Sequence, residues 1–133
     1  MTETAEVQLF AINTKELTID FYYSDVTNYL PINEIEKIGK KKKHKDLLNS
    51  LIGYLIITGY LCKYAGVRRE RIEFHRNQWG KPFLKNDLKW KGSFNISHSN
   101  DWVICGISNS QIIGVDIEKK NSHEHLFFKL LFY

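Results

Sequence analysis

The runs "GSFNISHS", residues 92–99, and "WVICGIS", residues 102–108, decide the fold of this chain. Both have the length and the β-branched or aromatic side chains of a strand, and the polar "HSND" that joins them is typical of a turn. A second polar stretch, "SNSQ" at 108–111, leads into "QIIGVDIE" at 111–118, which predicts a further strand. The three runs together predict an antiparallel meander.

One long helix is expected before these strands. From about His44 to Tyr64 the pattern is helical, and Gly66 is placed to end the helix. The uncharged stretch 47–62 is shorter than the roughly 20 residues that a membrane helix needs, and it contains polar residues and glycines. We therefore expect a buried helix and not a membrane anchor.

The remaining elements are shorter. Strands are expected at 7–12, 71–76 and 82–85, whereas 17–23 either pairs with the first strand or links it to a short helix that begins near residue 33. Helices followed by several consecutive strands are typical of α+β proteins. The expected fold is an antiparallel sheet packed on one long helix.

The composition fits a single folded domain. The chain has 133 residues, of which 43% are hydrophobic, and this is enough to bury a core. Its net charge of +4 suggests an anionic partner, but it fits nucleic acid, a membrane surface and a small phosphate ligand equally well. The acidic N-terminus lacks the layout of a signal peptide, and the two cysteines have no paired spacing. We expect a cytoplasmic protein.

Two acids alternate with apolar residues in "IGVDIE", residues 113–118. Side chains two positions apart in a strand face the same way, so Asp116 and Glu118 should share one face. Two such carboxylates provide part of a site for Mg²⁺, which takes one or two carboxylates together with substrate phosphates and waters. The competing interpretation is a solvated face of the sheet.

Hydrogen-bonding side chains occur close by, at Ser97 and His98. A hydroxyl and an imidazole can both bind phosphate oxygens, and the imidazole adds charge when it is protonated. A hydrolytic pair of nucleophile and base is disfavoured, because adjacent residues of a strand point to opposite faces.

Basic residues occur in two places. The segment "NQWGKP", residues 77–82, predicts a tight turn that would hold Lys81 rigidly enough to meet an anion. The run "GKKKKHK", residues 39–45, is either a solvated helix start or a site for a polyphosphate.

In their order and spacing, "WGKP", "FNISHS", "WVICGIS" and "IGVDIE" resemble the 4′-phosphopantetheinyl transferases of the monomeric, two-half type. These enzymes activate the peptide and polyketide synthetases of antibiotic biosynthesis. The resemblance covers about residues 5–120, and it implies one half of a pseudo-dimer. Residues 1–120 are then the N-terminal half, and 121–133 are the start of a truncated second half. Within the latter, "HLFFKLLFY" is expected to begin a helix.

The resemblance also implies an activity. A holo-carrier-protein synthase of this type moves 4′-phosphopantetheine from coenzyme A to a serine of an acyl or peptidyl carrier protein, and it requires Mg²⁺. The implied partners are coenzyme A and the carrier protein, with no part for nucleic acid or membrane.

Site residues follow by correspondence with the family's motifs. Asp116 and Glu118 correspond to its metal-binding acids, and together with His98 they form the implied catalytic set. The residues implied to bind coenzyme A are Lys45, Lys81, Ser97 and His98. Of these, Lys45 stands where the family often has an arginine for the 3′-phosphate of the nucleotide.

The family's second half supplies an F-[ST]-x-x-E segment and a W-x-x-K-E motif that this sequence does not contain, and neither Glu124 nor Lys129 has the flanking residues to replace them. Three alternatives follow. The chain is a transferase impaired by truncation, whose exposed cleft face favours self-association; or it rebuilds a site by dimerising; or it is a non-catalytic module that binds coenzyme A or a carrier protein.

Overall fold

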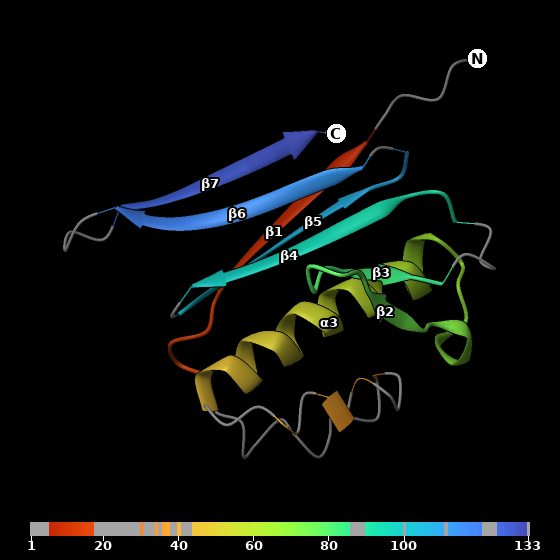
Figure 1. Cartoon of the computed structure of the whole chain (residues 1–133), viewed down its shortest axis with the longest axis horizontal. Helices are drawn as coiled ribbons and strands as arrows, with labels where there is room; N and C mark the ends of the chain where they lie inside the picture. Colours follow the sequence, from red (N-terminus) through yellow and green to blue (C-terminus); the bar gives the residue numbers. More distant parts are fainter. Residues whose placement is uncertain are drawn as a thin grey trace.

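A computed structural model describes residues 6–17, 30, 34, 36, 37, 40, 44–85, 90–99, 101–110, 112–120 and 125–132, without the side chains of 44, 118–120 and 125–128. These residues form three layers, which are a long helix, a three-stranded sheet and a two-stranded hairpin (Figure 1). A small second hairpin lies beside the helix. The predicted α+β class, with antiparallel strands packed on one long helix, is confirmed.

The central sheet has the strand order β1-β5-β4 and is antiparallel throughout. Its strands are β1 (Val7–Asn13), β5 (Trp102–Ser108) and β4 (Ser93–Ser99). Strands β4 and β5 form the hairpin that the turn "HSND" predicts, with Ser99 opposite Trp102. Strand β5 lies in the middle of the sheet and is buried from Val103 to its end, because it is covered on both faces.

Helix α3 (His44–Tyr64) covers one face of this sheet and has the predicted bounds. Near its end, the N–H groups of Ala65 and Val67 both donate to the Leu61 carbonyl, at 3.2 and 3.1 Å, on either side of Gly66. Within the described part of the chain, no helix has the length and apolarity to cross a membrane. The core between helix and sheet includes Leu51, Ile57, Leu61, Phe94, Val103, Cys105 and Ile107.

A small hairpin follows the helix. A 3₁₀ turn, η2 (Arg69–Arg71), leads into β2 (Phe74–Arg76), which pairs with β3 (Pro82–Leu84). The strand expected over 71–76 is therefore shorter than predicted. Its first residues are held in the turn, because the N–H groups of Arg71 and Ile72 donate to carbonyls three residues earlier.

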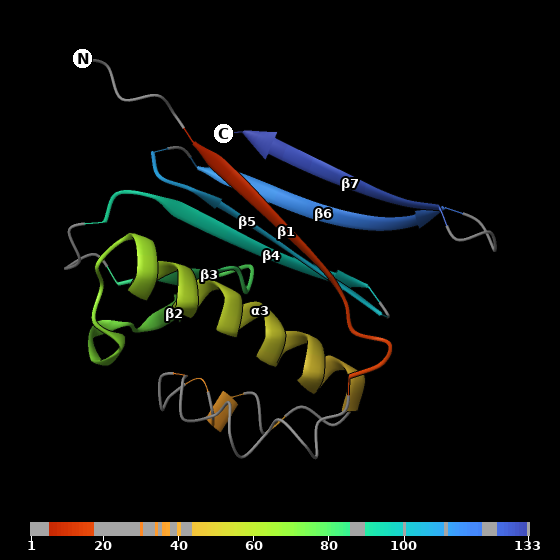
Figure 2. The ribbon, with the colours of Figure 1, turned by 180° about the vertical axis from the view of Figure 1, so that it is seen from behind.

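The third layer is a hairpin of β6 (Ile113–Lys120) and β7 (His125–Phe132). It packs on the sheet face opposite α3, as both views show (Figures 1 and 2). The expected meander is therefore wrong at β6, which is not a sheet neighbour of β5. The physical reason lies at Gly106 of β5, where an added Cβ would come within 2.5 Å of Val115 Cγ1. The missing side chain allows β6 to lie over the sheet.

The expected helix at the C-terminal end is also wrong, because residues 125–132 form β7. Along β7, Leu130 lies opposite Val115 and packs against the cluster of Ile104, Val115 and Ile117. The exposed Lys129 alternates with it. This alternation has the period of a strand, and β7 supplies the backbone partner that one edge of β6 requires.

Several expectations fall partly outside the described residues. Glu34, Glu36 and Lys37 are helical, but residues 33, 35 and 38 of the expected short helix are not described. Leu17 has no regular structure, and the rest of 17–23 is likewise not described. The division of the chain into 1–120 and 121–133 stays a prediction.

Candidate functional site

Strand β4 has one apolar and one polar face. Phe94 and Ile96 pack in the core under α3, so the residues that alternate with them along β4 face the other side of the sheet, where β6 lies. Ser93, Asn95 and Ser97 occupy these positions. The motif "SFNIS" therefore combines a core surface with a row of polar groups.

This polar row holds β6 in place. The Val115 N–H donates to Asn95 Oδ1 at 2.7 Å, and the Ile113 N–H donates to Ser93 Oγ at 3.2 Å. Side-chain oxygens of β4 thus accept the hydrogen bonds that a neighbouring backbone would accept in a sheet. These bonds fix the position of β6 along the length of β4. Sequence reasoning missed Ser93 and Asn95 as site residues, although the alternation of polar positions along β4 was a signal that could have found them.

The result is contact between two of the predicted site residues. Ser97 Oγ donates to Asp116 Oδ1 at 3.4 Å, and the Ile117 N–H donates to the same oxygen at 3.0 Å. Asp116 is only partly buried. Its carboxylate is therefore held in one orientation by two donors while it stays accessible.

The oxygen atoms of Asp116 and Glu118 are the candidate ligands for Mg²⁺. Both bonds of Asp116 described here use Oδ1, so Oδ2 remains available to a cation. Glu118 lies two positions further along β6, and its side chain is not described. The described part of the chain contains no cluster of three His, Cys, Asp or Glu residues that could hold a metal. The Asp116 carboxylate, with Oδ2 accessible, fits an ion that is shared with phosphates and waters.

His98 and Lys45 lie elsewhere. His98 is exposed and alternates with Ser97, so it shares the sheet face of Phe94 and Ile96. Lys45, in the first turn of α3, donates to Asp101 Oδ1 at 2.8 Å and to the Thr14 carbonyl at 3.2 Å. A phosphate that binds Lys45 would have to compete with Asp101.

The turn that carries Lys81 forms as predicted. The Gly80 N–H donates to the Asn77 carbonyl at 3.0 Å, and Asn77 Oδ1 accepts from the N–H groups of Trp79 and Lys81, both at 2.9 Å. Gly80 has a φ of 83°, which a side chain would strain. Lys81 Nζ donates to the Ile113 carbonyl at 3.2 Å. The turn therefore places an ammonium group at the start of the strand that carries Asp116.

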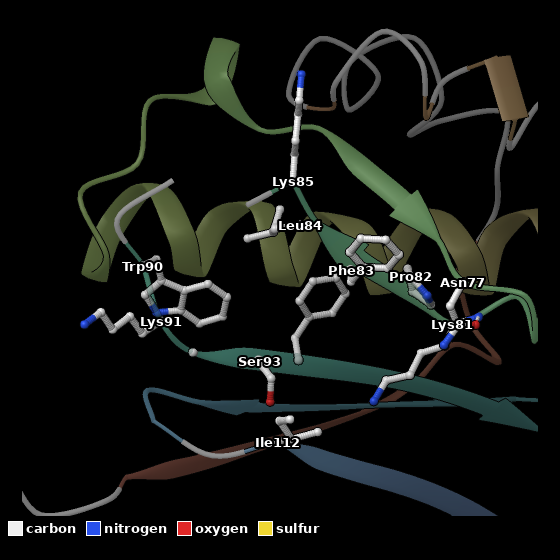
Figure 3. Close-up of a pocket in the computed structure, with 12 residues that line it drawn as sticks. Asn77, Lys81, Pro82, Phe83, Leu84, Lys85, Trp90, Lys91, Ser93 and Ile112 are labelled. Carbon is white, nitrogen blue, oxygen red and sulfur yellow. Dashed lines mark hydrogen bonds between the residues drawn. The ribbon is translucent and has the colours of Figure 1, made fainter. Parts of the chain in front are cut away.

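A cavity of about 630 Å³ opens beside Lys81, between β3 and the start of β4 (Figure 3). Phe83, Phe94 and Trp90 supply aromatic walls, and Lys81 supplies charge at the edge. The ammonium ends of Lys85 and Lys91 point away from these rings (Figure 3), and Lys85 lies 3.7 Å from Glu73. No acid is among the described residues that line it. Its size is usual for a small-molecule site, and its chemistry suits an anion with a flat apolar part. Sequence reasoning missed Trp90, because nothing local indicates that it lines a cavity beside β3.

Comparison with protein-family models identifies the family of this chain. The family model described as "4'-phosphopantetheinyl transferase, N-terminal" matches residues 19–110. This is more than half of the chain, and it includes α3, the central hairpin and the turn with Lys81. The chain therefore belongs to the 4′-phosphopantetheinyl transferase family and corresponds to its N-terminal region.

Individual relatives agree with the class. The chain is 45% identical over 75 residues to 4'-phosphopantetheinyl transferase gsp of Aneurinibacillus migulanus, covering 56% of this chain and 30% of that protein. It is 36% identical over 84 residues to 4'-phosphopantetheinyl transferase Sfp of Bacillus subtilis (strain 168), covering 63% and 36%. A match at 33% identity over 64 residues, 47% and 27% of the two chains, is to 4'-phosphopantetheinyl transferase HetI of Nostoc. The chain spans about a third of the length of these relatives.

Proposed function

We propose that this chain carries the coenzyme A and Mg²⁺ surface of a 4′-phosphopantetheinyl transferase. The reaction it would serve transfers 4′-phosphopantetheine to a serine hydroxyl of an acyl or peptidyl carrier protein, in the cytoplasm. The observation that carries the proposal is the arrangement along β6. Lys81 contacts the strand at Ile113 beside the aromatic cavity, and Asp116 is oriented further along by Ser97.

This arrangement suits a pyrophosphate ligand with a nucleotide at one end. The cavity would take the nucleotide, and Lys81 would bind phosphate oxygens at its edge. Ser97 would hold the Asp116 carboxylate for the metal, with Glu118 as the second acid. Mg²⁺, when bound, would neutralise charge on the pyrophosphate and on the leaving phosphate. His98 would donate to a phosphate only if the ligand crosses the end of β4, because its side chain lies on the other face.

The balance of the reaction shows what the site must stabilise. A bond forms between the serine oxygen and the phosphorus of phosphopantetheine, and the bond from that phosphorus to the bridging oxygen breaks. The serine hydroxyl releases its proton to solvent, and adenosine 3′,5′-bisphosphate leaves with the added negative charge. Ammonium groups at the phosphates lower the energy of this charge.

A second candidate is a non-catalytic module that binds coenzyme A or a carrier protein. It is favoured by Lys81 and the aromatic cavity, which can bind an anionic ligand without a metal. The two candidates differ in turnover and not in binding, so a transfer assay separates them.

The test measures transfer of labelled phosphopantetheine from coenzyme A to an apo carrier protein by mass spectrometry, with Mg²⁺ or with EDTA. The oligomeric state of the protein is determined in the same buffer by light scattering. Modification that requires Mg²⁺ supports the transferase. Coenzyme A binding without modification, where a full-length relative is active, supports the binding module. Absence of both refutes the proposal.

Two variants locate the site. Asp116→Ala should abolish the effect of Mg²⁺ on coenzyme A binding, whereas His98→Ala should weaken binding even without the metal. Glu70→Ala, at an exposed position in η2, is the matched control and should leave both unchanged. Binding that is equal in the wild type and both site variants would remove these residues from the site.

A further inference from the structure

Strand β7 places a positive charge beside Asp116. Lys129 is the register partner of Asp116 in the β6–β7 hairpin. Side chains of directly opposed residues in an antiparallel pair project from the same face, with Cβ atoms about 4.5–5.5 Å apart. The neighbouring pair, Val115 and Leu130, packs toward the sheet. Asp116 and Lys129 therefore share the outer face of the hairpin.

The two charges do not neutralise each other by direct contact. No ion pair joins Lys129 to Asp116, both of which are described residues. The Asp116 oxygen Oδ1 is instead turned toward β4 by Ser97 and by the Ile117 N–H. Lys129 is exposed, and its flexible four-carbon stem allows its ammonium group to move over this face.

We propose that Lys129 is an anion-binding residue of the site, and that its ammonium group contacts phosphate oxygens of the ligand whose metal Asp116 holds. The inference rests on the proposed function for the identity of that ligand. The chain thereby supplies from β7 a cation that its sequence motifs do not indicate. The competing interpretation is a lysine that only keeps the edge strand β7 from pairing with other chains.

The two interpretations predict different effects of removing the Lys129 charge on the affinities for Mg²⁺ and for pyrophosphate. A positive charge beside a metal-binding carboxylate opposes bare Mg²⁺, but it attracts a metal–pyrophosphate complex that carries net negative charge. Removing the charge should therefore strengthen binding of Mg²⁺ alone and weaken binding of pyrophosphate in the presence of Mg²⁺. For an exposed charge, each change should be about two- to fivefold. A lysine that only protects an edge would change neither.

The experiment is isothermal titration calorimetry with Mg²⁺ alone, and with inorganic pyrophosphate in saturating Mg²⁺. The variants are Lys129→Ala and Lys129→Arg, with Lys63→Ala at an exposed position in the last turn of α3 as the control. Circular dichroism shows whether each variant is folded. We expect opposite shifts for Lys129→Ala, wild-type pyrophosphate affinity for Lys129→Arg, and no shift for Lys63→Ala. Unchanged pyrophosphate affinity in Lys129→Ala, or shifts of both affinities in the same direction, would overturn the proposal.

These results separate the inference from the proposed function. Opposite shifts in a protein that neither binds nor transfers from coenzyme A would retain Lys129 as a pyrophosphate ligand and refute the proposed function. Mg²⁺-dependent transfer with no effect of Lys129→Ala would retain the proposed function and refute the role of Lys129. A wild-type protein with no measurable pyrophosphate affinity would also refute that role.

Discussion

At the scale of single residues, Asn95 decides where Asp116 lies. Its amide oxygen accepts from the Val115 N–H at 2.7 Å, one residue before the acid. Without this bond the N–H would remain unpaired between two layers, because β4 offers β6 its side chains here and no paired backbone. A residue that touches no ligand in the proposed site therefore sets the distance between Ser97 and Asp116.

We expect Asn95→Ala to lower the free energy of unfolding by about 1–3 kcal/mol, because a partly buried backbone donor loses its partner. Urea denaturation checks the change in stability. The same variant should also weaken the Mg²⁺ effect on ligand binding under conditions where it is still folded. Gln78→Ala, at an exposed turn position, is the control, and equal stability of the two variants would contradict the role given to Asn95.

At the scale of elements, the β6–β7 hairpin depends on the absence of a side chain at Gly106. A Cβ there would lie 2.5 Å from Val115 Cγ1 and 3.0 Å from Ile113 Cδ1. Both of these atoms belong to β6, and Val115 directly precedes Asp116. The position of the candidate metal site is therefore coupled to the close approach of β6 to the central strand.

We expect Gly106→Val to displace β6 and to lower the free energy of unfolding by about 1–3 kcal/mol through overpacking. Hydrogen exchange should show faster exchange in β6 and β7 than in α3, because the helix packs on the other face of the sheet. Gly59→Ala is the control, since nothing lies within 4 Å of an added Cβ there. That change should stabilise α3 by about 0.5–1 kcal/mol. Uniformly faster exchange in α3 and the hairpin would contradict the prediction.

Elements differ in how far the sequence predicted them. The bounds of α3 and the β4–β5 hairpin could be predicted, because apolar periodicity and turn residues act over a few neighbouring positions. The position of β6 over the sheet could not be predicted, since it depends on Gly106 and Asn95, which are distant from β6 in sequence. The C-terminal strand was predicted as a helix from the resemblance, whereas its alternation of Lys129 and Leu130 fits a strand.

At the scale of the whole molecule, an ionic cluster around the buried carboxylate of Glu34 joins three separate segments. The carboxylate of Glu34 is fully buried, and both its oxygens lie 3.4 Å from nitrogens of Arg76 in β2. Arg76 also donates to the Tyr54 hydroxyl in α3, and Lys37 lies 3.5 Å from Glu34. The cluster therefore ties residues 34 and 37 to the helix and to the hairpin that carries Lys81.

This cluster predicts a loss of stability at alkaline pH. Burial, and then the charge of Glu34, raise the pKa of Tyr54 from 10.0 to about 12. The folded state therefore favours the neutral phenol, and this contribution to stability is complete below about pH 10 and is lost as the pH rises toward 12. We expect the free energy of unfolding to fall over this range.

Urea denaturation at pH 9 and at pH 11 measures that fall. Tyr54→Phe should make it smaller, because the variant has no hydroxyl to ionise at this position. Tyr64→Phe, at an exposed position at the end of α3, is the matched control and should retain the wild-type fall. An equal fall in wild type and Tyr54→Phe would show that the cluster does not cause it.

The sequence by itself determined the α+β class, the long helix, the central hairpin, the turn around Lys81 and the family, because each depends on local periodicity or on a short motif. Only the tertiary structure decided that Asp116 meets Ser97, that Lys81 lies at an aromatic cavity and that Lys129 stands opposite Asp116. These contacts join residues from separate strands. They arise because Gly106 has no side chain to keep β6 away from the face of the sheet opposite α3. They also arise because polar side chains of β4 accept hydrogen bonds from the backbone N–H groups of β6 there.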